Sequence, residues 1–245
     1  MGQIVRPLTS PLHPWLPTRA ASEALALWAL CFAAILVTFS LSHPAAKLVA
    51  TVGFLYLPLL SMDRRGEDYA DYGLSTRRLG RDLLQFLAVG AVVFPLFILG
   101  YFAFTRLYVE LPPSWSRVFT PYVAQPSFHF KLPDRFAEWT IDQLFVVALP
   151  EEFFYRGFLQ TRLRDAWPTG RLFFGARLGR AFWITALLFA LGHLAIFQVW
   201  RLAVFFPALL FGWMRERSGS VVGPALFHAA SNLLIQVLDA SFFGG

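Results

Sequence analysis

The chain has 245 residues, of which 57% are hydrophobic, 17% aromatic and only 15% charged. Soluble domains carry about 25% charged residues, so this chain has too little polar surface to cover a water-exposed globule. The composition excludes a soluble enzyme, a disordered chain and, with Cys31 as the single cysteine, a disulfide scaffold. Arginine-rich loops between membrane spans explain the net charge of +6 better than nucleic acid binding does. We therefore expect an integral membrane protein surrounded by the lipid bilayer.

Seven apolar segments follow a proline-broken leader at residues 1–20, which is too polar to be a signal peptide. A membrane-spanning helix needs about 20 mostly apolar residues to cross roughly 30 Å of hydrocarbon. We therefore predict an all-α polytopic membrane helix bundle of about seven transmembrane helices, forming a single integral membrane domain over residues 1–245. The predicted spans are 21–41, 45–62, 83–108, 139–163, 181–199, 202–214 and 221–238.

The arginines alternate between the two ends of this bundle as the positive-inside rule requires. Three connections, which follow spans two, four and six, must share one side of the membrane, and all three are rich in arginine. We therefore predict a multi-pass protein of the cell (inner) membrane with a cytoplasmic N-terminus and an extracytoplasmic C-terminus. The arginines of these three connections are Arg64, Arg65, Arg77, Arg78 and Arg81, then Arg162, Arg164, Arg171, Arg177 and Arg180, then Arg215 and Arg217.

The stretch 106–138 is the one sizeable segment outside the predicted spans, and it is rich in proline and aromatic residues. On the predicted topology it is an extracytoplasmic loop. Two interpretations remain open for it. It can lie on the outer leaflet as an interfacial loop, or it can cover a site in the membrane as a lid.

Polar and ionisable side chains occur inside three of the predicted spans, where such groups are costly and are therefore functional candidates. Span four contains the run PEEFFYRG over residues 150–157. Span five contains FALGH over residues 189–193, and span seven contains FHAASN over residues 227–232. We expect these groups to lie at comparable depth in the membrane.

Helical spacing separates the two neighbouring glutamates. Glu152 and Arg156 are four residues apart, so they can pair on one face of the helix. Glu151 lies about 100° around the helix from Glu152 and is left free to face another partner. His228 and Asn232 are also four residues apart and can reach one point. His193 follows a glycine that permits close approach of helices.

This set of groups fits water attack on an amide carbonyl. A carboxylate and an imidazole can hold and deprotonate a water molecule, here Glu151 and His193. A His/Asn pair can donate hydrogen bonds to a developing oxyanion, here His228 and Asn232. Zinc is a competing interpretation, because Glu151, His193 and His228 could supply three ligands. The helical zinc-protease signature H-E-x-x-H is absent, however, and asparagine is a poor zinc ligand.

Each group also has a structural explanation, since Glu–Arg pairs, buried histidines and asparagine clamps join helices in many membrane proteins. Two other function classes follow. A non-proteolytic binding or scaffold protein could use the same polar pocket, and it would tolerate Glu151→Gln. A proton-coupled transporter could use Glu151 and His193 as a relay, but the chain lacks the matching halves that transporters usually show.

The motifs resemble those of the CPBP family of CAAX-processing and bacteriocin-processing intramembrane proteases, also called the Abi family. The family patterns are E-E-x-x-x-R, F-x-x-x-H and H-x-x-x-N. They correspond here to Glu151–Arg156, Phe189–His193 and His228–Asn232. Residues 156–159 and 217–224 also resemble the sequences around the family motifs. The resemblance covers about 110 residues, in the region 139–240 that we assign to the catalytic core helices.

The resemblance implies a glutamate-dependent intramembrane endopeptidase without a required cofactor. It assigns Glu151 as general base, His193 to the water, His228 and Asn232 to the oxyanion, and Glu152 and Arg156 to support of the site. Some relatives cleave prenylated C-termini, but this sequence offers no feature that would bind a prenyl group. We therefore expect a membrane-anchored protein or peptide substrate, cut near its C-terminal membrane-anchored tail on the extracytoplasmic side.

Overall fold

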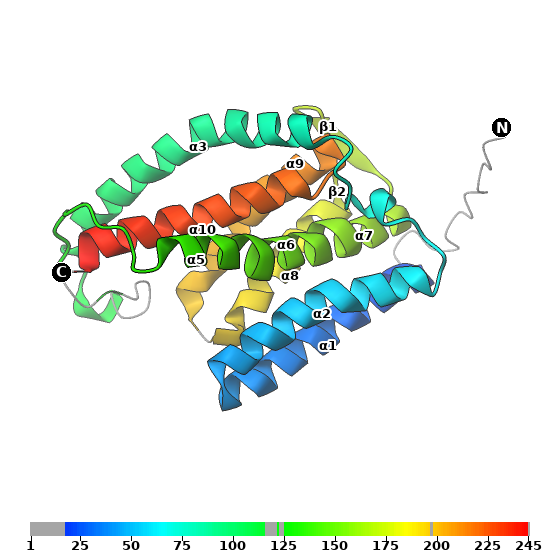
Figure 1. The fold of residues 1–245 in the computed structure, drawn as a ribbon, viewed down its shortest axis with the longest axis horizontal. Coiled ribbons are helices and arrows are strands. Elements are labelled where there is room, and N and C mark those ends of the chain that lie inside the picture. Colours follow the sequence, from blue (N-terminus) through cyan, green and yellow to red (C-terminus); the bar gives the residue numbers. More distant parts are fainter. Residues whose placement is uncertain (1–17, 116–121, 123–124, 197, 245) are drawn as a thin grey trace.

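The computed structural model describes residues 18–115, 122, 125–196 and 198–244, so nearly all of the predicted leader lies outside the described residues. The first two helices, α1 (Arg19–Leu41) and α2 (His43–Asp63), form an antiparallel hairpin (Figure 1). The side chain of Thr18 caps α1, and Ser42 caps α2 with Pro44 in its first turn. These local signals explain why the chain reverses so tightly at Ser42.

Helix α3 (Leu79–Tyr108) lies on the opposite side of the molecule from the α1–α2 hairpin (Figure 1). Helix α10 (Val222–Phe243) packs between α3 and the helix that begins at Phe136. Among the described residues, α1, α2, α3 and α10 are the four helices long and apolar enough to cross a membrane. These observations confirm the all-α membrane bundle.

A composite helix over residues 136–166 replaces the regular span predicted for 139–163. It consists of α5 (Phe136–Asp142), a π-helical segment (Gln143–Ala148), α6 (Leu149–Glu152), a second π-helical segment (Phe153–Leu159) and α7 (Gln160–Ala166). Every residue of the second π-helical segment is buried. This segment is buried on all sides because other helices surround it, although it contains the charged residue Arg156.

The predicted boundaries of spans five and six were wrong. Helix α8 (Arg180–His193) ends six residues before the predicted Val199, and α9 (Phe205–Ser218) begins three residues after the predicted Leu202. Short 3-10 turns, Leu194–Ile196 and Val199–Val204, connect them. At 1.5 Å per residue each helix is only about 21 Å long, shorter than the hydrocarbon core of a bilayer. The 3-10 turns extend both α-helices toward each other, so the two segments meet at Ile196 and Val199.

A small antiparallel hairpin, β1 (Gly170–Phe173) and β2 (Ala176–Gly179), joins α7 to α8 and was not predicted. Its turn places Phe174 and Gly175 at positive φ angles of 44° and 78°. Arg217 donates to the Phe174 carbonyl oxygen and Arg162 pairs with Glu67. These contacts bring the three arginine-rich connections to one end of the bundle, which agrees with the alternation of the arginines.

The described part of the 106–138 stretch covers the opposite end, where α10 finishes. The backbone N–H groups of Ser127 and His129 donate to the carbonyl oxygens of Phe242 and Ser241, at 3.0 and 2.8 Å. The last carbonyls of a helix have no partner within the helix, so this segment satisfies them. Its structural role is therefore to close the C-terminal end of α10.

Candidate active site

A buried ion pair forms the base of the site. Arg156 Nη1 donates to Glu152 Oε1 at 2.9 Å, and neither side chain is exposed to solvent. This is the pair that the four-residue spacing predicts. Arg156 also donates from Nη2 to the Ala208 carbonyl oxygen at 3.2 Å. Its guanidinium lies 4.2 Å from the centre of the Phe189 ring, so the charge is held by hydrogen bonds and an aromatic face.

Glu152 has a second partner that sequence spacing could not reveal. His228 Nδ1 lies 2.9 Å from Glu152 Oε1, so one carboxylate oxygen accepts from both the arginine and the imidazole. A carboxylate of an ion pair accepts and does not donate, so Nδ1 of His228 carries the proton. The contact fixes the ring and turns Nε2 away from Glu152. Glu152 therefore links the support pair to the histidine of α10.

The freed edge of His228 faces Glu151, since Nε2 lies 4.0 Å from Glu151 Oε2. The side chain of Glu151 is 19% exposed. Its Oε2 atom is nevertheless buried, and it has no hydrogen-bond partner among the described residues. A buried carboxylate oxygen without a partner costs free energy, so such a group in a structure calls for an explanation. The two neighbouring glutamates thus have different environments, as their angular separation on the helix predicts.

His193 lies at the C-terminal end of α8, where its Nδ1 is 2.9 Å from the Phe189 carbonyl oxygen. A carbonyl oxygen only accepts, so Nδ1 is the protonated nitrogen and Nε2 of the neutral ring is left as an acceptor. The neighbouring Gly192 permits the close approach that we predicted. A Cβ atom there would lie 2.7 Å from the hydroxyl oxygen of Tyr155.

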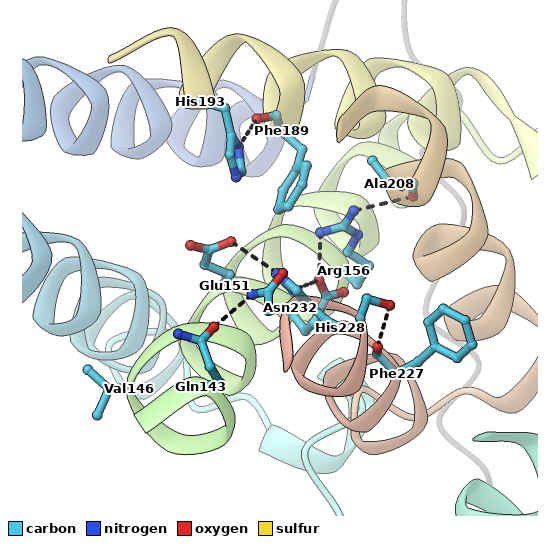
Figure 2. Close-up of polar contacts among 12 residues, drawn as sticks. Gln143, Val146, Glu151, Arg156, Phe189, His193, Ala208, Phe227, His228 and Asn232 are labelled. Carbon is cyan, nitrogen blue, oxygen red and sulfur yellow. Dashed lines mark hydrogen bonds and ion pairs between the residues drawn. The ribbon is translucent and has the colours of Figure 1, made fainter. Parts of the chain in front are cut away.

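Asn232 is oriented by Gln143, a residue that the sequence analysis missed. Asn232 Nδ2 donates to Gln143 Oε1 at 2.8 Å, which leaves the second N–H of the amide free (Figure 2). In a regular α-helix Gln143 would point about 80° away from Glu151, because eight residues turn the helix by about 800°. The wider π-helical turn at Gln143–Ala148 reduces the rotation per residue, and both side chains line the same cavity.

A cavity of about 720 Å³ joins these groups. Glu151, His193, His228 and Asn232 all line it, together with apolar side chains of α3, α9 and α10. Arg156 and Glu152 lie behind this wall and do not line it. No described residue of the 106–138 stretch lines the cavity, so the described part of this loop gives no support to a lid. Within the described residues, no three His, Cys, Asp or Glu side chains are grouped as metal ligands would be.

Comparison with known proteins gives one family match. Residues 134–234 match the model of the type II CAAX prenyl endopeptidase Rce1-like family. The matched segment contains Glu151, His193, His228 and Asn232, and it ends within α10. No curated protein and no solved structure matches the chain. The match covers 101 of the 245 residues and agrees with the CPBP resemblance. Together with the membrane helices, it indicates a protease, that is, a peptide hydrolase, similar to the CAAX endopeptidases.

Proposed function

We propose that the protein hydrolyses a peptide bond near the C-terminal membrane-anchored tail of a protein substrate, with a water molecule activated by Glu151 and His193. One observation supports this most directly. The Glu151 carboxylate has an oxygen without a hydrogen-bond partner among the described residues, and it lies in the cavity that His193, His228 and Asn232 also line. A carboxylate oxygen that faces a cavity and has no other hydrogen-bond partner is suited to accept a proton from water.

The proposed reaction gives each of the four side chains a role, and Glu151 acts twice. His193 Nε2 accepts a hydrogen bond from the water, and Glu151 takes its proton as the oxygen attacks the carbonyl carbon. The carbonyl becomes an oxyanion that accepts from the free Asn232 N–H. His228 donates from Nε2 when its ring is doubly protonated. Glu151 then returns the proton to the leaving amine, which breaks the C–N bond. Pre-oriented donors of this kind lower the barrier because they need no reorganisation.

The topology supports cleavage toward the extracytoplasmic side. The cavity extends from Glu151 to Trp139 on the composite helix and to Gln236 on α10. This direction leads away from the arginine-rich connections, which the positive-inside rule places in the cytoplasm.

Purified protein in detergent provides the direct test. The substrates are a farnesylated C-terminal peptide and a peptide with one leucine-rich transmembrane span, both carrying the same short C-terminal tail. Mass spectrometry then identifies the fragments. We expect wild-type protein to release a C-terminal fragment from at least one of them. The proposed substrate class would be contradicted if neither peptide were cleaved, even with the enzyme in excess over the substrate.

Removal of divalent metal separates the glutamate mechanism from the zinc alternative. We expect cleavage to be unchanged, within about twofold, after dialysis against a strong zinc chelator, because the proposed proton transfers need no metal-bound water. The measurement is the initial rate before and after dialysis, with zinc added back in a parallel sample. A rate that falls with the chelator and returns with zinc would favour Glu151, His193 and His228 as metal ligands.

Substitution of Gln143 tests whether Asn232 needs to be oriented. We expect Gln143→Leu to lower kcat about 10- to 100-fold with little change in KM, because Asn232 would lose the acceptor that fixes its amide. Gln143→Glu keeps an acceptor oxygen at this position, now from a carboxylate, so it should retain more activity than the leucine variant. Equal rates for wild-type protein and Gln143→Leu would show that the hydrogen bond to Asn232 has no part in the reaction.

A further inference from the structure

An arginine lies on the wall of the cavity at a position outside all three family motifs. Arg201 belongs to the 3-10 turn Val199–Val204 between α8 and α9. It lines the cavity together with Trp200 and with His193, eight residues earlier in the chain. The same cavity is lined by Glu151 and His228, so Arg201 faces the space into which the candidate site opens.

The charge of Arg201 is not neutralised within the described part of the chain. Its Nε donates to Gln198 Oε1 at 3.1 Å, and the guanidinium carbon lies 5.2 Å from the centre of the Trp200 ring. Both partners are uncharged. No described carboxylate lies within 4.0 Å of Arg201, in contrast to Arg156 and Arg162, which are both paired with glutamates.

The described contacts of Arg201 orient its side chain but use only one of its hydrogen-bond donors. A guanidinium offers five N–H donors in a planar fork, and the two terminal nitrogens can bind both oxygens of one carboxylate. Gln198 holds only the Nε edge. The fork formed by the terminal nitrogens therefore has no hydrogen-bond partner among the described residues. A partly buried cation of this kind gains free energy from an anion that enters the cavity.

We propose that Arg201 is a carboxylate-binding subsite that holds the free C-terminal carboxylate of the peptide substrate. The inference rests on the proposed function, because it uses the same cavity. The cavity has a volume of about 720 Å³, which is large enough for a peptide of a few residues. A C-terminal carboxylate at Arg201 and a peptide bond at Glu151 can therefore lie in the same cavity. The subsite would select substrates whose scissile bond lies a short distance from a free C-terminus.

Binding to the Glu151→Gln protein tests this subsite without requiring cleavage. The probes are two peptides with one leucine-rich span and the same short tail, one ending in a carboxylate and the other in a carboxamide. We expect the carboxylate peptide to bind roughly 10- to 100-fold more tightly, because a hydrogen bond to a charged group is stronger than one to a neutral group. Adding Arg201→Gln should lower the affinity for the carboxylate peptide to that for the carboxamide peptide.

Two further variants control for charge. Arg201→Lys keeps the positive charge without the planar fork, so it should retain an intermediate preference. Arg106→Gln removes an exposed cation at the end of α3, outside the cavity, and should keep the full preference. Equal binding of both peptides to the Glu151→Gln protein, binding of neither, or a preference that survives Arg201→Gln would overturn the subsite.

Two outcomes distinguish this inference from its alternatives. If the carboxylate preference depends on Arg201 and yet no peptide is cleaved by wild-type protein, the subsite stands and the proposed function fails. If phosphatidylglycerol in nanodiscs abolishes the preference and the zwitterionic phosphatidylcholine does not, Arg201 binds an anionic lipid headgroup and the peptide subsite is overturned.

Discussion

Replacement of Glu151 by glutamine is expected to lower kcat for peptide cleavage by at least about 10²- to 10⁴-fold, the range typical of a lost general base. Glutamine keeps the size of the side chain and much of its hydrogen bonding, but it cannot accept the proton of the attacking water. Since Glu151 Oε2 has no hydrogen-bond partner among the described residues, the substitution breaks no described hydrogen bond of that oxygen. The variant should therefore fold and bind substrate as wild-type protein does.

The measurement compares initial cleavage rates and thermal unfolding of the two proteins in the same detergent. Glu138→Gln is a matched control, because Glu138 is 62% exposed, pairs with Arg135 and does not line the cavity. We expect the control to cleave at the wild-type rate. If Glu151→Gln retained cleavage within about tenfold of wild type, Glu151 would have no role in proton transfer.

Helical spacing predicted contacts within one helix of the candidate site, but it did not predict contacts between helices. Spacing on a helix correctly paired Glu152 with Arg156, and it correctly separated Glu151 from that pair. These relations lie within one turn, where helix geometry determines them. The contact between Glu152 and His228 joins residues 76 positions apart, and no local rule places α10 against the composite helix.

Gln143 was missed for a different reason. It is one of several polar residues near the start of an apolar span, and a regular helix would turn it away from Glu151. The π-helical turn that brings it to the cavity has no sequence signature that we could use. A polar residue eight positions before a catalytic carboxylate is therefore worth examining whenever the helix between them can widen.

The end of α8 shows the limit of composition as a guide to membrane helices. Residues 194–199 are as apolar as those of the preceding helix apart from Gln198, so hydropathy continues the predicted span to Val199. The chain instead tightens into 3-10 turns at Leu194. Hydropathy shows which residues tolerate lipid, but it does not show where an α-helix ends within an apolar run. The 3-10 turn that follows places Arg201 on the wall of the cavity.

Replacement of Arg156 by alanine is expected to destabilise the protein by about 3–5 kcal/mol, the cost of leaving one partner of a buried ion pair without its counter-charge. Glu152 has no exposed surface and would keep only the hydrogen bond from His228. Its Oε2 atom already lacks a hydrogen-bond partner among the described residues, so the remaining charge would have little compensation. The aromatic rings around the guanidinium would also border a void.

Thermal unfolding and the yield of folded protein in detergent measure this effect. Arg171→Ala provides the control, since Arg171 is exposed on β1 and its loss should change stability by no more than about 0.5 kcal/mol.

Arg156→Lys separates the effect of the charge from that of the shape of the side chain. Lysine can pair with Glu152 but cannot also reach the Ala208 carbonyl oxygen with a planar fork, so an intermediate stability is expected. If Arg156→Ala were as stable as Arg171→Ala, the ion pair would not support the fold. The charge of Arg156 would then act only through Glu152 on His228, and its loss would appear in the cleavage rate alone.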